Sequence, residues 1–455
     1  MTTLSLNFLK FQMNKKITIF FLALIFLSNC SFDNKTGIWK NNDEITKITK
    51  NRFKDFETIY TEEKLFNSVI APTSNLNIQS ETSVTPDEWK DEFYNDSNNL
   101  DSFNYKNLNE IIFKSKKISK KDTKDRILFI KNNVIITNVN GDVIVFSVEQ
   151  KRIIFKFNFY QKKMKKFKKV LNTIVEENVI YISDNLGYFY AINILEQKLI
   201  WAKNYKVPFR SNLKISGNKI YASNQDNFLL IIDKLNGDQI RSIPTEEIVI
   251  KNRFVNSLAI KNSSLFFLNN FGSLYSIDTS TNKINWFINL NKSIDLNPSD
   301  LFYSNPILAY EDKVIISTDP YFYVLSAKSG STISKDLITS LTKPIISKGN
   351  IFLVTKDNLL VCKNLDAEKI LYSLDIEQEI ASFLGTKKKS VNIKDISIVN
   401  DNIYLFLENS YMVIFNLNGK LMEITKLKDR LKSHPIFVNQ SILFLNNKNN
   451  LLVIN

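Results

Sequence analysis

The sequence predicts an all-β fold, a β-propeller of eight four-stranded antiparallel blades, and three observations lead to this prediction. A short β-rich run recurs along the chain at intervals of 37 to 52 residues. A turn residue follows most of these runs at a nearly constant offset. In several copies a large aromatic residue then recurs at a fixed distance behind that turn. Repeats of about this length are typical of architectures in which each copy forms one supersecondary unit, propellers included.

The first two observations define the repeat unit. The eight β-rich runs are anchored at Val134, Val179, Ile220, Leu265, Val314, Ile351, Ile403 and Ile442. Six to eight positions later come the turn residues Gly141, Gly187, Asn227, Gly272, Pro320, Asn358, Ser410 and Asn449. The runs that follow close on small polar residues, at Ser147, Asn193, Asp233, Asp278, Ser326, Asn364, Asn416 and Asn455. Eight anchors indicate eight blades.

The third observation is the aromatic position. Trp201 and Trp286 each lie fourteen positions after the turn glycine of their copy, and Phe155 and Tyr372 occupy the matching place. A small β unit cannot bury both of its faces alone. A large aromatic residue on the outer strand therefore packs against the neighbouring blade. We expect these aromatics to be core residues rather than a platform for a cofactor.

The ends of the repeat region indicate how the ring closes. The last copy ends at Asn455, where its third strand finishes. The unassigned β-like run 109–114, with the sequence NEIIFK, lies directly before the first copy. We predict that this run pairs with the last blade as its outer strand and removes an open sheet edge.

The composition excludes several chemistries. The 455 residues include one His and two Cys, too few for a disulfide framework, a zinc cluster or acid–base chemistry built on several histidines. The formal charge of +14 allows acidic partners or an anionic membrane. The basic runs that start at Lys162 and Lys387 fall between expected strands, and we interpret them as solvated loops rather than nucleic-acid sites.

The N-terminal quarter, residues 1–108, is predicted to be an export signal and a tether. Residues 1–29 combine a basic start with an apolar core too short to span a bilayer, which is typical of a signal peptide. Residues 27–30, with the sequence LSNC, resemble a bacterial lipobox, although Asn29 departs from the usual Gly or Ala. The resemblance implies lipidation of Cys30 and, with Ser31 next, export to the outer membrane. We expect residues 30–108 to be a tether, with one helical face between Asp43 and Phe66 and a flexible linker over 71–99.

The repeats over 109–455 resemble those of quinoprotein-like propellers. The pattern Gly-x-x-Tyr-x-Ile-Asp…Lys-x-x-Trp is almost complete in residues 270–290, and residues 184–205 match nearly as well. With the lipobox and tether, the chain resembles the propeller lipoproteins of the outer-membrane β-barrel assembly machinery, the BamB family. The long tether and the basic charge depart from typical members.

The family resemblance implies a function and a set of contacts. It implies a non-enzymatic scaffold, without cofactor or metal, on the periplasmic face of the outer membrane of a Gram-negative bacterium. Its partners would be the periplasmic domains of the barrel-inserting subunit and nascent outer membrane proteins. Family contacts on inter-blade loops match Phe209 and Arg210 in one loop and Asp300 in another. Arg210 would pair with a carboxylate, Phe209 would fill an apolar pocket, and Asp300 would meet a basic residue.

Two other classes of function stay open. A quinone-dependent oxidoreductase would need a quinone, commonly calcium, a carboxylate base and often adjacent cysteines. After lipidation the chain keeps only Cys362, in an apolar run where we expect a buried, inert thiol. We expect His434 to be structural, because no paired acid or base is evident. A free-standing propeller for ligand binding or adhesion is the second alternative.

Overall fold

The computed structural model describes residues 30–32, 39–41, 64–164, 166–246, 255–291 and 302–455. Contacts divide the chain into two units, Met1–Glu63 and Lys64–Asn455. In the first unit, β1 (Cys30–Phe32) pairs with β2 (Trp39–Asn41) in antiparallel fashion. The predicted signal segment and residues 43–63 of the predicted helix lie outside the described residues. Within the described ranges, no helix has both the length and the apolar character to cross a bilayer.

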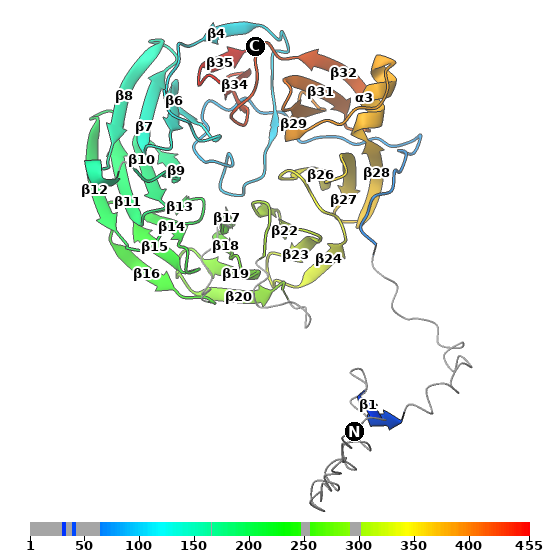
Figure 1. Ribbon diagram of the computed structural model, residues 1–455, viewed down its shortest axis with the longest axis horizontal. Helices are drawn as coiled ribbons and strands as arrows, with labels where there is room; N and C mark the ends of the chain where they lie inside the picture. Colours follow the sequence, from blue (N-terminus) through cyan, green and yellow to red (C-terminus); the bar gives the residue numbers. More distant parts are fainter. Residues whose placement is uncertain (1–29, 33–38, 42–63, 165, 247–254, 292–301) are drawn as a thin grey trace, which may run out of the picture. The chain divides into compact units, whose positions relative to one another are not determined.

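The second unit is the predicted eight-bladed propeller (Figure 1). Blade 1 comprises β5 (Leu128–Ile130), β6 (Asn133–Thr137), β7 (Asp142–Ser147) and β8 (Arg152–Asn158). Blade 2 comprises β9 (Leu171–Glu176), β10 (Val179–Asp184), β11 (Tyr188–Asn193) and β12 (Lys198–Asn204). Blade 3 comprises β13 (Lys214–Ser216), β14 (Lys219–Ser223), β15 (Leu229–Asp233) and β16 (Gln239–Ile243). Blade 4 comprises β17 (Ser257–Lys261), β18 (Ser264–Leu268), β19 (Ser273–Asp278) and β20 (Ile284–Asn289). Each blade is an antiparallel sheet.

The remaining blades follow the same order from the inner to the outer strand. Blade 5 comprises β21 (Leu308–Tyr310), β22 (Lys313–Ser317), β23 (Phe322–Ser326) and β24 (Thr332–Asp336). Blade 6 comprises β25 (Ile345–Ser347), β26 (Asn350–Val354), β27 (Leu359–Asn364) and β28 (Lys369–Asp375). Blade 7 comprises β29 (Ile393–Val399), β30 (Asn402–Leu407), β31 (Tyr411–Asn416) and β32 (Leu421–Lys426). Blade 8 begins with β33 (Ile436–Val438), β34 (Ser441–Leu445) and β35 (Leu451–Ile454). In the described parts of the connections between blades there are two short helices, η1 (Lys162–Met164) and α3 (Ile376–Leu384).

The turn between the second and third strands repeats one local structure. Asn138 opens this turn in blade 1, and its Oδ1 accepts the backbone N–H groups of Asn140 and Asp142 at 3.0 and 3.1 Å. Asp184, Asn224, Asn269 and Asn446 do the same in four other blades. The predicted turn residues then adopt positive φ, at Gly141, Gly187, Asn227, Gly272, Asn358, Ser410 and Asn449. Asn and Ser replace Gly here at a conformation that Asn tolerates better than most residues.

The recurring aromatics join neighbouring blades, as predicted. The Trp201 indole of blade 2 donates to Lys234 O of blade 3 at 3.1 Å, and its ring covers Gly237. Trp286 of blade 4 donates to Ala327 O of blade 5 at 3.0 Å. Tyr372 of blade 6 donates to Leu417 O of blade 7 at 3.0 Å. Each ring therefore fills the space between two sheets and satisfies its polar atom at a turn of the next blade.

The ring closes as predicted. β4 (Ile111–Lys114) pairs antiparallel with β35 and supplies the outer strand of blade 8. The bridging pair Lys114–Asp429, 2.8 Å between Nζ and Oδ2, adds a contact to the connection that follows β32. One end of the repeat region therefore holds the other.

Residues 71–99 are a correction to the prediction. Their low apolar content predicts a flexible linker, but the structure packs them onto the propeller, with Trp89 only 4% exposed. The chain first follows the outer edge of blade 6, where Ile70 and Ser373 exchange backbone hydrogen bonds of 2.8 and 2.9 Å. It then crosses to the centre of the ring, seen as the blue to cyan trace inside the blades of Figure 1.

Residues 86–103, called the central segment below, contact the inner strand or its flanking residues in every blade. Bridges join Trp89 to Phe129 of blade 1 and Asp91 to Ile174 of blade 2. The short strand β3 (Ser102–Phe103) runs parallel to β29 of blade 7. The contacts to the other five blades are Lys214–Asp91, Asn98–Leu258, Asn98–Ile307, Asn99–Ile346 and Phe103–Phe437.

The central segment packs here because its side chains form hydrogen bonds with backbone groups of the inner strands. The Asn98 side-chain amide donates to Leu258 O and Ile307 O, both at 2.8 Å. Asn99 donates to Ile346 O at 2.9 Å and accepts from Ile346 N at 2.9 Å. Asparagine side chains thus pair polar backbone groups that would otherwise face the channel unpaired. The composition that predicts a linker is the composition that fits this channel.

Candidate interaction surface and central channel

The predicted contact loop lies between β12 and β13, on the face of the ring that carries all connections from one blade to the next. We call this the connection face. Arg210 is partly exposed there, and its guanidinium Nη2 lies 3.3 Å from Gln225 Oε1. Its backbone N–H donates to Ser223 O and its carbonyl accepts from Asn256 N, both at 2.8 Å. Blades 3 and 4 therefore fix the backbone from which the guanidinium projects.

Phe209, the apolar half of the predicted pair, faces inward. Its side chain is 1% exposed and packs at 5.4 Å, centroid to centroid, against both Phe189 and Tyr205. Its backbone N–H donates to Asp184 O at 2.9 Å. In the described structure the ring fills the protein's own core rather than offering itself to a partner. Any role of Phe209 in binding would act through the position that it gives to Arg210.

The other predicted site residues have less structural description. Asp300 lies outside the described residues, in the connection between β20 and β21. Cys30 begins β1, where its backbone is paired with Asn41. The roles of Asp300 and Cys30, like that of Arg210, remain predictions.

A hollow of about 430 Å³ opens near the centre of the connection face, beside the Arg210 loop. The Arg126 guanidinium stacks over the Phe93 ring at 5.0 Å inside it. Val255 and Tyr303 line the hollow with 61% and 58% of their surface exposed. These residues carry no signal in the sequence, because they belong to irregular connections without repeat periodicity. Apolar residues beside charged ones in a concave site are a common feature of binding surfaces.

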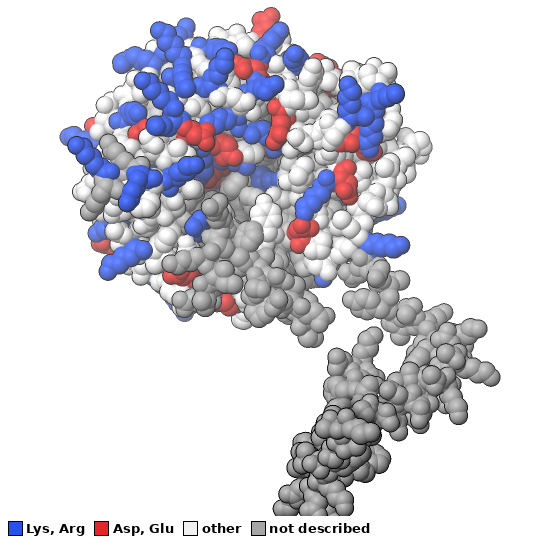
Figure 2. Space-filling view, viewed as in Figure 1, with Lys and Arg blue, Asp and Glu red and all other residues white. Residues whose placement is uncertain are grey.

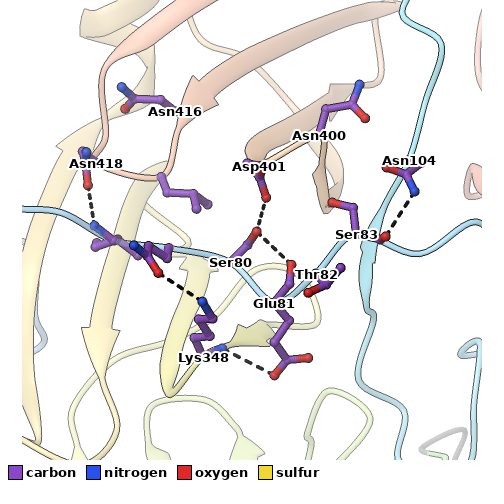
Figure 3. Close-up of a pocket in the computed structure, with 13 residues that line it drawn as sticks. Ser80, Glu81, Thr82, Ser83, Asn104, Lys348, Asn400, Asp401, Asn416 and Asn418 are labelled. Atoms are coloured by element: carbon purple, nitrogen blue, oxygen red, sulfur yellow. Dashed lines mark hydrogen bonds between the residues drawn. The ribbon is translucent and has the colours of Figure 1, made fainter.

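A polar pocket of about 750 Å³ lies at the opposite end of the channel, where residues 78–83 approach the turns of blades 6 and 7 (Figure 3). Ser80 donates to Asp401, and Lys348 Nζ donates to Gln79 Oε1 at 3.1 Å. Asn418 Oδ1 accepts from Ile78 N at 2.8 Å. These bonds tie the approaching chain to the turns, so the polar groups of this pocket already serve the fold.

Charged groups inside the channel pair with one another. Lys214 and Asp91 are joined at 2.7 Å, with side chains 0% and 4% exposed. Burial raises the pKa of Asp91, and the Lys214 ammonium opposes that shift. His434 Nδ1 lies 2.7 Å from Asp395 Oδ2, so the single histidine has a structural partner that the sequence did not reveal. Burial and the Arg126 charge lower the pKa of His434, while Asp395 opposes them.

The residues present do not fit a quinone cofactor and its cation. The central segment fills the channel, and the space left beside Trp89, Arg126 and His434 is about 10 Å³. Among the described residues, no three His, Cys, Asp or Glu side chains converge as ligands for a metal. Cys362 is buried in β27, and burial raises the pKa of its thiol well above the ordinary range.

Comparisons with known proteins agree with the repeat analysis. A family model described as outer membrane protein assembly factor BamB matches residues 140–373, more than half of the chain. The structure of BamB from Moraxella catarrhalis has a TM-score of 0.60 at 12% identity, over 76% of this chain and 99% of that one. No curated protein matches the sequence.

Other solved structures share the fold. The quinohemoprotein alcohol dehydrogenase from Comamonas testosteroni has a TM-score of 0.59 at 9% identity, over 81% of this chain and 80% of that one. The computationally designed Ika8 protein has a TM-score of 0.53 at 11% identity, over 75% of this chain and 99% of that one. At such identities these likenesses show the fold alone.

The repeats, the ring and the aromatic contacts between blades define a quinoprotein-like β-propeller of eight blades. Within that class, the match over residues 140–373 is to one family. The chain belongs to the family described as outer membrane protein assembly factor BamB.

Proposed function

We propose that this protein is a non-enzymatic scaffold lipoprotein of the outer-membrane β-barrel assembly machinery. It binds the periplasmic domains of the barrel-inserting subunit and helps to deliver outer membrane proteins. The family match over residues 140–373 carries the proposal. The lipobox-like residues 27–30 and Ser31 support lipid anchoring at Cys30 and a location on the periplasmic face of the outer membrane.

The connection face supports a binding role. Arg210 is held at the rim of a concave surface by backbone hydrogen bonds to Ser223 and Asn256. A guanidinium in a fixed position can form two parallel hydrogen bonds to one carboxylate, which gives both affinity and direction. A carboxylate on the partner is therefore the group that Arg210 would recognise.

The filled channel supports the non-enzymatic part of the proposal. In this chain the centre of the ring holds Asn98, Asn99 and the Lys214–Asp91 pair, each bonded to its neighbours. A substrate and a cofactor would have to displace these contacts. The dehydrogenases with the same fold are only 8–10% identical to this chain in sequence, so their activity is not carried over to it.

The test is affinity isolation of the tagged full-length protein from gently solubilised membranes. We expect the barrel-inserting subunit to co-purify with the wild type and to be lost, at least about tenfold, with Arg210→Glu. Arg241→Glu is the matched control, because Arg241 is an exposed arginine that lies on outer strand β16, away from the connection face. The proposal fails if the subunit is absent, or if both variants behave alike.

Anchoring has its own experiment. We expect the wild type to fractionate with outer membranes and to incorporate labelled fatty acid, whereas Cys30→Ser is released to the soluble periplasmic fraction. Equal labelling of both proteins would contradict lipidation at Cys30.

A further inference from the structure

Lysine side chains concentrate in one connection between blades. The segment from β4 to β5, which joins blade 8 to blade 1, carries Lys116, Lys117, Lys120 and Lys121, all exposed. The acidic Asp122 of the same segment already pairs with Lys432 of the neighbouring connection. The other acid of the segment, Asp125, lies 3.7 Å from His434 Nε2, so neither acid of this loop forms an ion pair with the four lysines.

The neighbouring connections repeat the pattern. The segment after β8 carries exposed Lys166 and Lys168, and the segment after β32 carries exposed Lys428 and Arg430. The segment after α3 adds Lys387 and Lys389, also exposed. Among the described residues, none of these cations belongs to the ion pairs that link the blades.

The four connections lie on one side of the disc. In an antiparallel four-stranded blade, every link from an outer strand to the next inner strand emerges on the same face. Figure 2 shows Lys and Arg gathered on the viewed face over blades 8, 1 and 2, with a second group near α3. The cations therefore form a broad arc rather than a pocket. We call this the basic arc.

Apolar side chains are exposed beside the basic arc. Phe167 is 50% exposed between Lys166 and Lys168, and Lys166 Nζ lies 5.2 Å from its ring centroid. Phe383 and Leu384, at the end of α3, are 50% and 53% exposed and precede the lysines that start at Lys387. Lysines that flank exposed Phe and Leu on one face are typical of surfaces that bind a membrane interface.

We infer that the basic arc docks the propeller onto an anionic phospholipid surface. The cations are spread over half of the face, which suits many separate headgroups better than one peptide. They are mostly lysines, which act as point charges without the fork geometry that recognises a single carboxylate. The exposed Phe and Leu would enter the headgroup layer. The inference is independent of the partner proposed for Arg210.

The experiment uses the full mature chain with Cys30→Ser, so that no acyl chain contributes. Vesicles of phosphatidylcholine alone are compared with vesicles that also contain phosphatidylglycerol, by co-sedimentation at low and high salt. We expect binding to the anionic vesicles only, with loss at high salt. The variant Lys116→Glu, Lys117→Glu, Lys120→Glu, Lys121→Glu should bind at least about tenfold more weakly.

A matched control separates the arc from net charge. The variant Lys198→Glu, Lys283→Glu, Lys369→Glu, Lys420→Glu changes the charge equally at exposed lysines near turns of the opposite face, and it should retain binding. Phe167→Ser, a single exposed change, should weaken binding without altering the melting temperature. Equal loss in the two lysine variants, equal binding to neutral vesicles, or no vesicle binding at all would overturn the inference. No vesicle binding together with lysine-dependent capture of the barrel-inserting subunit would assign the arc to an acidic protein instead.

Discussion

Lys214 and Asp91 form an ion pair that water does not reach, with 2.7 Å between Nζ and Oδ2. Lys214 belongs to the inner strand of blade 3, whereas Asp91 belongs to the central segment. Lys214 also donates to Asn95 O at 2.8 Å, and Asp91 accepts from Phe93 N at 2.7 Å. The pair therefore fastens the segment to the ring at two points.

Breaking this pair should be costly. Lys214→Met leaves the Asp91 carboxylate buried without its partner, and we expect a loss of about 3 to 5 kcal/mol in the free energy of unfolding, measured by urea denaturation. The double variant Asp91→Asn, Lys214→Met removes both charges and keeps an acceptor for Phe93 N. It should recover at least half of that loss. Additive losses in the double variant would argue against direct coupling of the two charges.

The contact between Trp201 and Gly237 gives a second prediction. A Cβ at Gly237 would lie 2.4 Å from the Trp201 ring, and the backbone there has a φ of 73°. We expect Gly237→Ala to lower the free energy of unfolding by about 2 to 4 kcal/mol, from strain and overpacking together. Gly217→Ala is the control, because its φ is 59° but nothing lies within 4 Å of the added Cβ. It should cost about 1 kcal/mol. Similar losses at both sites would mean that backbone strain alone decides.

Lys343 predicts a dependence of stability on pH. Its Nζ donates to Asn98 O at 2.6 Å, and burial, with the Arg126 and Lys214 charges, lowers its pKa from 10.5 to about 7 against the opposing Asp395 and Asp91. At a pH between about 7 and 10.5, Lys343 keeps its proton in the unfolded chain and has lost it in the folded chain. The free energy of unfolding should therefore rise from pH 7 to pH 9, by about 1 kcal/mol because the side chain is partly exposed.

Lys343→Met supplies the comparison for that pH dependence. The variant has no group to titrate at this position, so its free energy of unfolding should change less over the same interval. Urea denaturation at several pH values measures both proteins. An identical rise in wild type and variant would assign the effect to other groups.

The order of residues 71–99 can be measured by hydrogen exchange. The amide of Trp89 donates to Phe129 O at 2.6 Å, and the amide of Val84 donates to Ser102 O at 2.8 Å. Both amides should exchange at least about a hundredfold more slowly than in an unstructured peptide, because they open only with the fold. Exchange at the rate of an unstructured peptide would instead support the prediction that residues 71–99 are a flexible linker.

The blades were predictable because the residues that form each turn and strand lie close together within one repeat. The Asn and Gly residues of the turns need only their neighbours in sequence, so Gly141 and Asn449 mark equivalent turns although one is Gly and the other Asn. Trp201 and Trp286 were predictable for a related reason, since the outer strand of every blade meets the same kind of neighbour. Even β4 was predictable, because blade 8 lacked an outer strand and no other β-like run was free.

The central segment was not predictable in this way. Asn98 and Asn99 bind backbone carbonyl groups of blades 4, 5 and 6, and a carbonyl group leaves no mark in the sequence. An Asn-rich stretch that is solvated and one that lines a backbone-rich channel have the same composition. Phe209 shows the converse limit, because the sequence placed it in the correct connection but could not show on which side of the backbone its ring lies.

The pairing of β4 with β35 also sets an order of events for a chain that crosses a membrane from its N-terminus. The central segment and β4 emerge first, yet residues 451–454, which complete blade 8, emerge last. In such a chain the inner strands of later blades would assemble around a segment that has emerged before them. Such long-range closure is slow relative to local hairpin formation. A chain that lacked only residues 451–455 would leave β4 without a partner strand and one edge of β34 unpaired.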